Sequence, residues 1–148
     1  MIYEGNTIIA GNATGTAVVT KQSINFLAAY SKNLVFTWKK GKIGDKEHEL
    51  FGMDLRDKIL FVPSSCGSTT GGLFLLEAIK AGIAPKAIIV QAADSLLVSG
   101  AILAEIWLEG VPLPPIIECP VAFSSVETGT PVVVKNNVVE VKVKKVVK

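Results

Sequence analysis

The sequence predicts an α/β domain in which a parallel β/α core is flanked by β-hairpins from the N- and C-terminal segments. Two observations lead to this fold class. In the middle of the chain, short apolar runs alternate with segments rich in helix-forming residues, as in proteins with a parallel sheet. At both ends, β-prone segments surround turns that contain Gly or Asn. The 148 residues suit one domain that spans positions 1–148.

Three buried strands are expected in the middle of the chain, at 58–62, 86–90 and 115–118, because each is a short and almost continuous apolar run. Between them, helices are predicted over 73–80 and from 96 to about 108. The signals at the helix ends are Gly82 and Pro85 after the first helix, Asp94 or Ser95 as the cap of the second, and Gly110 after it. This order predicts parallel strands joined by right-handed crossovers.

The two ends of the chain read as β structure. The segments 7–10 and 16–19 flank a Gly- and Asn-containing spacer and predict a hairpin. A second hairpin is predicted from 131–135 and 138–141, with Asn136-Asn137 as its turn. The lysines that follow, Lys142, Lys144 and Lys145, are interpreted as protection of a sheet edge.

Residues 21–52 give a weaker signal. Short β-prone runs at 24–27 and 34–38 are interpreted as possible strands. The charged segment 41–52 is expected to form an exposed loop, and His48 within it to be solvated.

Composition excludes several classes of protein. Hydrophobic residues make up 49% and charged residues 19% of the chain, which excludes intrinsic disorder. A net charge of +2 gives no argument for nucleic acid or an anionic membrane. The apolar stretch 101–117 contains two glutamates and three prolines, which argues against a membrane span. The mean hydropathy of +0.46 indicates more apolar surface than a small domain hides easily, so a permanent partner is expected.

The location of the protein is expected to be cytoplasmic. The N-terminus shows no basic segment followed by an apolar one, so no signal peptide is predicted. The two cysteines, Cys66 and Cys119, are too few for a disulfide framework or a metal site, which fits a reducing compartment. Trp38 and Trp107 are expected in cores or interfaces, and Glu105 and Glu109 on a solvated helix face.

The loop 64–72 is the candidate for chemistry. It consists of small residues between the carboxyl end of a strand and a helix N-terminus, where backbone amides attract anions. It is neither a Walker A loop nor a dinucleotide fingerprint. A simpler interpretation is that Ser68 or Thr69 only caps the helix. Cys66 in this loop is either an activated thiol or merely an accessible one.

A serine such as Ser68 acts as a base only when it is ionised, and that needs electrostatic help. The helix terminus supplies part of this help, but the preceding residues, Cys66 and Gly67, supply no cation. From the residues alone, the loop is therefore compatible with catalysis, anion binding or capping.

Several motifs in their order and spacing resemble one known family. They are Gly-x-Ile-x-Asp-x-x-His-x-Leu-x-Gly at 41–52, Lys-Ile-Leu at 58–60, Pro63, Gly-Ser-Thr-x-Gly at 67–71, Glu-Ala at 77–78, Gly-x-Ala-Pro-x-Ala-Ile-Ile at 82–89, Gly-Ala-Ile-x-Ala-Glu at 100–105 and Val-Pro at 111–112. From about Gly11 to Ile117, the chain resembles the small subunit of the aconitase X family.

The resemblance implies a swivelling β/β/α domain and a hydro-lyase that removes water from a small hydroxy acid. Activities of the family are dehydration of cis-3-hydroxy-L-proline and of mevalonate 5-phosphate; the segment 105–112 favours the hydroxyproline type. An iron–sulfur cluster or metal is expected in a large partner subunit, with none bound by this chain. The proton-abstracting role carries over to Ser68. Substrate-binding roles fall on the neighbouring loop residues Cys66, Gly67, Thr69, Thr70 and Gly71.

The sequence departs from the family at Cys66, where members often carry Arg or Lys, and at Ala28-Ala29, where they commonly have two glycines. The departure at Cys66 favours one alternative, a non-catalytic swivel or assembly domain. A free-standing anion-binding protein is a third possibility.

Overall fold

The computed structural model describes residues 1–35, 40–67 and 69–142 of the chain. Within them, one sheet contains eight strands in the order β1-β8-β7-β3-β4-β5-β6-β2. The strands are β1 (Ile2–Glu4), β2 (Asn6–Ile9), β3 (Asn12–Val19), β4 (Lys58–Val62), β5 (Ala87–Val90), β6 (Ile116–Glu118), β7 (Pro131–Lys135) and β8 (Val138–Val141). The four central strands β3, β4, β5 and β6 are parallel, and the other pairs are antiparallel.

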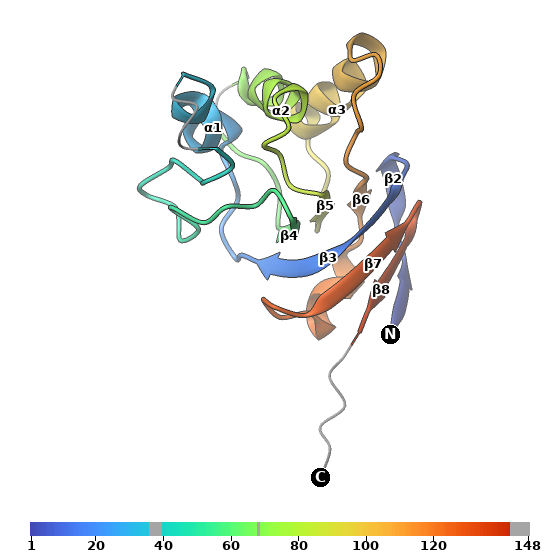
Figure 1. Ribbon diagram of the computed structural model, residues 1–148. Coiled ribbons are helices and arrows are strands. Elements are labelled where there is room, and N and C mark those ends of the chain that lie inside the picture. The colour runs from blue at the N-terminus through green and yellow to red at the C-terminus, as the bar shows by residue number, and fades with distance from the viewer. Residues whose placement is uncertain (36–39, 68, 143–148) are drawn as a thin grey trace.

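The helices are α1 (Phe26–Val35), α2 (Gly71–Lys80), α3 (Ser95–Trp107) and the 3₁₀ helix η2 (Pro120–Ser125). Figure 1 shows α1, α2 and α3 side by side on one face of the parallel strands, with β7 and β8 on the other side. The predicted parallel β/α core and the C-terminal hairpin β7–β8 are confirmed. No helix in the described part of the chain is long and apolar enough to cross a membrane.

The parallel strands are buried on both faces, because one face packs on the helices and the other on the antiparallel strands. Along β4, Leu60 and Val62 belong to the core under the helices, whereas Ile59 and Phe61 belong to a second core with β7 and β8. This double burial explains why β4, β5 and β6 appear in the sequence as unbroken apolar runs.

The predicted N-terminal hairpin is wrong. β2 pairs with β6 and β3 pairs with β4 and β7, so the two segments do not pair with each other. β1 and β2 lie at opposite ends of the strand order and only Gly5 separates them, so the sheet curls until its ends meet there. A Cβ at Gly5 would lie 2.4 Å from the carbonyl oxygen of Glu118, so this meeting point leaves no room for a side chain.

The strand considered at 24–27 is wrong, and the first two residues of the run 34–38 are also helical, because Phe26–Val35 forms helix α1. Its buried residues, Phe26, Ala29, Tyr30 and Asn33, follow the helical period of three to four residues. Phe36, Thr37 and Trp38, the rest of that run, lie outside the described residues.

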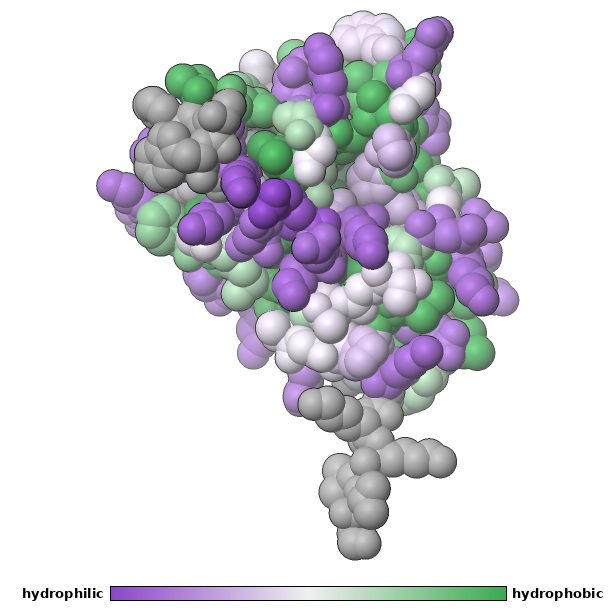
Figure 2. Space-filling view, in the orientation of Figure 1, coloured by the Kyte–Doolittle hydropathy of each residue, from purple (hydrophilic) through white to green (hydrophobic). Residues whose placement is uncertain are grey.

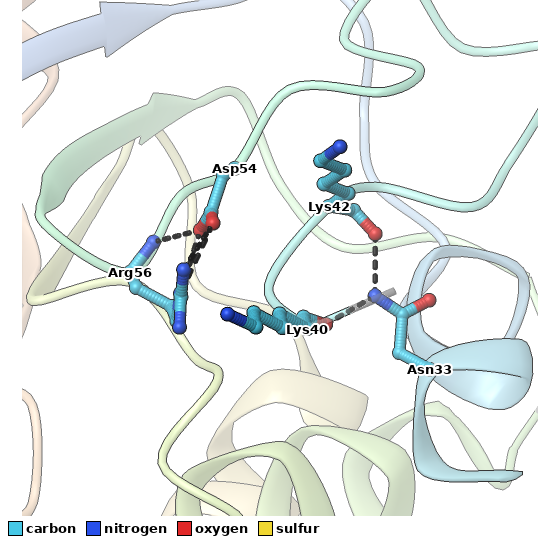
Figure 3. A network of polar contacts seen from close by, with 5 residues as sticks. All are labelled: Asn33, Lys40, Lys42, Asp54 and Arg56. Carbon is cyan, nitrogen blue, oxygen red and sulfur yellow. Dashed lines mark hydrogen bonds and ion pairs between the residues drawn. The ribbon is translucent and has the colours of Figure 1, made fainter. Parts of the chain in front are cut away.

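The segment 41–52 is a loop, but it is not exposed throughout, since Ile43 and Leu50 are buried in the core. Figure 3 shows how the start of this segment is attached to α1: the Asn33 Nδ2 atom donates to the carbonyl oxygens of Lys40 at 2.6 Å and Lys42 at 2.5 Å. Beside them, Asp54 and Arg56 form an ion pair at 2.7 Å, and the hydrogen bond from Arg56 lowers the pKa of the Asp54 carboxyl.

Two glycines let α2 and α3 touch through their backbones. A Cβ added to Gly72 would lie 2.6 Å from the carbonyl oxygen of Leu96, and one added to Gly100 would lie 2.5 Å from the carbonyl oxygen of Gly72. The first turn of α2 is therefore packed directly against the first two turns of α3. The carbonyl oxygens of Leu96 and Gly72 are fixed in the helix backbones and cannot move aside.

We expect Gly72→Ala to lower the free energy of unfolding by roughly 1–3 kcal/mol, because the added methyl group forces the two helices apart. Gly71→Ala is the matched control, since a Cβ there meets no atom of the described residues within 4 Å. It should leave stability unchanged or raise it by up to about 1 kcal/mol. Urea unfolding of the purified variants measures both, and equal effects at the two positions would contradict this account of the helix contact.

Candidate functional site

The candidate loop, residues 63–70, leaves the carboxyl end of β4 and enters α2. Its first half is paired on one side with the segment that follows β3. The Ile24 amide donates to the Ser64 carbonyl at 3.1 Å, and the Cys66 amide donates to the Ile24 carbonyl at 2.8 Å. The hydroxyls of Ser23 and Ser64 lie 3.0 Å apart. The loop thus begins as a short extension of the parallel sheet.

Position 67 requires glycine. Its φ of +92° is disfavoured for other residues, and a Cβ would lie 2.3 Å from the Asn25 Nδ2 atom. Asn25 itself is held at the start of α1, where its Oδ1 atom accepts from the Ala28 amide at 3.3 Å. The backbone at Gly67 therefore lies directly against the Asn25 side chain, and any side chain at this position would clash with it.

On the other side, Asp94 binds the loop. Its carboxylate accepts from the Ser65 amide at 2.8 Å and the Ser65 hydroxyl at 2.5 Å. It also accepts from the amides of Leu96 and Leu97, both at 3.0 Å, and so caps α3 as one of the two residues predicted for that role. The bond between Asp94 and Ser65 was not predictable from local sequence, because 29 residues separate the two.

The structure brings five of the six predicted site residues together at this edge of the sheet. Cys66, Gly67, Thr69 and Thr70 are exposed, and Gly71 is the buried first residue of α2. Ser68, the predicted base, lies outside the described residues.

Thr70, and not the Thr69 considered for the role, occupies the N-cap position of α2. The first amides to bond within the helix are those of Leu73 and Phe74, which donate to the Thr70 carbonyl at 3.1 and 3.2 Å. The amides of Gly71 and Gly72 precede these bonds, so they belong to the helix end that carries partial positive charge.

His48 is buried and not solvated, so this expectation is wrong. Only 7% of its surface is exposed, its Nδ1 atom accepts from the Leu50 amide at 3.1 Å, and its Nε2 atom lies 3.3 Å from the Gln22 carbonyl oxygen. Next to it, the Glu49 carboxylate accepts from Thr20 and Lys21, and these hydrogen bonds lower the pKa of Glu49. Both residues fix the segment after β3 that supports the candidate loop.

Three cavities lined by described residues lie away from the candidate loop. One of about 440 Å³ is lined by residues 124–130, and two of about 570 and 320 Å³ lie around the C-terminal end of α2. Among the residues that the structure describes, no three His, Cys, Asp or Glu side chains are grouped to hold a metal ion. The candidate loop is therefore an exposed edge that presents backbone amides and hydroxyls, and its described residues do not fit a metal.

The Cys66 thiol is accessible, and its surroundings raise its pKa. Burial of the sulfur raises the pKa of Cys66, and the negative charges of Asp45 and Asp94 raise it further. These effects oppose that of the helix N-terminus, so they favour the interpretation of Cys66 as a merely accessible thiol. Cys119, by contrast, is fully buried.

These features define a class of protein. It is an α/β domain in which helices cover one face of a curled sheet and a loop of small residues is exposed between β4 and α2. The family model of the aconitase X swivel domain matches residues 2–143, so the chain belongs to this family. The resemblance read from the sequence motifs is thereby confirmed.

Three similar proteins illustrate the family. The phosphomevalonate dehydratase small subunit of Thermococcus sibiricus is 37% identical over 72% of this chain and 77% of its own length. The cis-3-hydroxy-L-proline dehydratase of Pseudomonas aeruginosa is 33% identical over 67% of this chain but over only 16% of its own length. The crystal structure of Thermococcus kodakaraensis aconitase X in its holo-form superposes with a TM-score of 0.79 at 28% identity, covering 97% of this chain and 99% of that chain.

We expect alkylation of Cys66 by iodoacetamide to become half-maximal at a higher pH than alkylation of a free cysteine. The reason is that only the thiolate reacts, and its formation is opposed by burial and by two carboxylates. Asp45→Asn removes one negative charge and should move the half-maximal pH downward, toward but not reaching that of free cysteine, since burial remains.

Mass spectrometry of the folded chain measures the labelling, and the buried Cys119 serves as the internal control that stays unlabelled. A half-maximal pH below that of free cysteine would contradict this account of the Cys66 environment.

Proposed function

We propose that this chain is the small subunit of a heteromeric dehydratase that removes water from a small hydroxy acid. The chain belongs to the aconitase X family, and its loop between β4 and α2 is fixed on both sides and exposed at a helix N-terminus. This combination is the observation that carries the proposal. The similar chain of Thermococcus sibiricus bears the name of such a subunit. As an active site the exposed loop is incomplete, which fits a reaction that takes place between two subunits.

In the proposed reaction, Ser68 accepts the proton. The Ser68 oxygen takes a proton from the carbon beside the substrate carboxylate. The electrons of that C–H bond form a C=C bond with the neighbouring carbon, whose C–O bond breaks, and the hydroxide that leaves takes up a proton from solvent to become water. The helix N-terminus of α2 stabilises negative charge at this position, and the loop amides and hydroxyls from Cys66 to Gly71 hold the anionic substrate.

The large subunit is proposed to supply what this chain lacks. A cation is needed beside Ser68 to favour the ionised serine, and Cys66 does not provide one. Since the described residues do not fit a metal, we assign the iron–sulfur cluster or metal, which would assist departure of the hydroxyl, to the large subunit. A cytoplasmic location is part of the same proposal.

Exposed apolar side chains support the existence of a partner. On the face shown in Figure 2, apolar side chains gather around the helix layer, above a band of hydrophilic ones. On α3, Ile102, Ile106 and Trp107 are 48%, 64% and 60% exposed. Trp107 therefore does not pack in this chain's own core, whereas Glu105 lies on the solvated face that was predicted for it.

Mevalonate 5-phosphate is the substrate that the comparisons favour, because the relative named for it is a separate small subunit that matches over most of its own length. The segment 105–112, which favours cis-3-hydroxy-L-proline, begins near the C-terminal end of α3. A helix of 13 residues is about 20 Å long, so this segment starts far from Asp94, which caps the other end of α3. cis-3-Hydroxy-L-proline remains the second candidate because of the Pseudomonas aeruginosa relative.

We expect Ser68→Ala in the complex with the large subunit to lower kcat by roughly 100- to 10,000-fold, because a positioned base contributes that much. The complex should still assemble, as judged by gel filtration. Ser124→Ala, at an exposed serine on η2, is the control and should leave kcat unchanged. A Ser68→Ala complex with the activity of the unaltered protein would refute the assignment of the base.

The substrate is tested by following water loss from both candidates with the co-expressed, metal-replete complex. We expect turnover of mevalonate 5-phosphate and none with either subunit alone. Turnover of cis-3-hydroxy-L-proline alone would reverse the choice of substrate. No turnover of either compound by an assembled complex would favour a non-catalytic assembly domain.

A further inference from the structure

The Asp94 carboxylate makes more hydrogen bonds than a helix cap needs. Its Oδ1 atom accepts from the amides of Leu96 and Leu97, which is the capping role. The same Oδ1 atom also accepts from the Ser65 hydroxyl, and Oδ2 accepts from the Ser65 amide. Oδ2 thus accepts only from the loop. Two of the four hydrogen bonds of this carboxylate join it to α3, and the other two join it to Ser65 in the loop between β4 and α2.

Ser65 is the last residue that is buried before the exposed part of the loop. It is 8% exposed, it forms a parallel bridge with Ile24, and Cys66 and Gly67 after it are exposed. The position at which the loop leaves the sheet is therefore set at Ser65. Asp94 holds that residue from the α3 side, and Ile24 holds its neighbours from the α1 side.

Gly67, two residues after Ser65, lies against the Asn25 side chain, since a Cβ there would lie 2.3 Å from the Asn25 Nδ2 atom. A shift of Ser65 would change the point at which the exposed part of the loop, beginning with Cys66 and Gly67, leaves the sheet. Misplacement of a reacting group by about 1 Å costs on the order of 100-fold in rate.

We propose that Asp94 is a positioning residue for the loop that carries Ser68, in addition to capping α3. This inference rests on the proposed function for its catalytic consequence, whereas its structural part concerns only the two hydrogen bonds to Ser65. Asp94 touches neither substrate nor reacting atoms in this account; it acts through Ser65.

The test uses variants that separate the capping of α3 by Asp94 from its hydrogen bonds to Ser65 in the loop. In Asp94→Ser the new hydroxyl still caps α3 but is too short to hold both Ser65 groups. Asp94→Asn keeps an oxygen for the cap but presents an N–H to the Ser65 amide, and Ser65→Ala removes only the hydroxyl bond. Each variant is co-expressed with the large subunit and assayed for kcat, KM and amide hydrogen exchange.

For Asp94→Ser we expect kcat to fall roughly 10- to 100-fold, with a smaller rise in KM because the same loop also holds part of the substrate. Exchange of the Ser65 and Cys66 amides should be at least about tenfold faster, while exchange in α3 stays unchanged. Ser65→Ala should show a smaller effect in the same direction. If Asp94→Ser also loosens α3, Asp94→Asn decides by the same criteria.

An unchanged kcat, or unchanged exchange at Ser65 and Cys66, would overturn the positioning role. A complex that turns over neither candidate substrate would refute the proposed function instead. In that case, the exchange measurement still decides whether Asp94 holds the loop.

Discussion

The parallel pairing of β4 with β3 and β5 is the constraint on which the rest of this structure depends. Parallel strands end at the same edge of a sheet, so the segments that follow β3, β4 and β5 meet there. The consequence is visible in the contacts of Ser65, which reach Ile24 after β3 on one side and Asp94 after β5 on the other. The Gly72–Gly100 contact completes the arrangement, because it holds the starts of α2 and α3 together behind the loop.

The elements that were predicted correctly are those whose signal is local. β4 and β5 are continuous apolar runs because both faces are covered, and the hairpin β7–β8 turns at Asn136, whose φ of +53° Asn tolerates better than most residues. The N-terminal hairpin failed because β propensity does not specify a partner, and β2 pairs with a strand more than 100 residues away. Helix α1 was missed because Phe26, Tyr30 and Val35 favour strands locally, whereas its helical burial pattern depends on the tertiary core.

In the candidate site, too, features with a local signal were predictable and long-range contacts were not. The location of the loop between a strand and a helix was predictable, as was a capping role for Asp94. What holds the loop was not predictable, since the contacts of Ser65 with Asp94, of Gly67 with Asn25 and of His48 with Gln22 join residues far apart in the sequence. Burial of His48 shows the point, because a histidine between charged neighbours finds its partners in the Gln22 carbonyl and the Leu50 amide. The role of Ser68 comes from the family resemblance and remains a proposal.

The central claim is that the loop between β4 and α2 forms one half of an active site that the large subunit completes. The most direct measurement is the rate at which Cys66, two residues before Ser68, is alkylated in the isolated chain, in the assembled complex and in the complex with substrate. The account predicts that the rate falls on assembly and falls again when substrate binds. A labelling rate that neither the large subunit nor the substrate changes would contradict it.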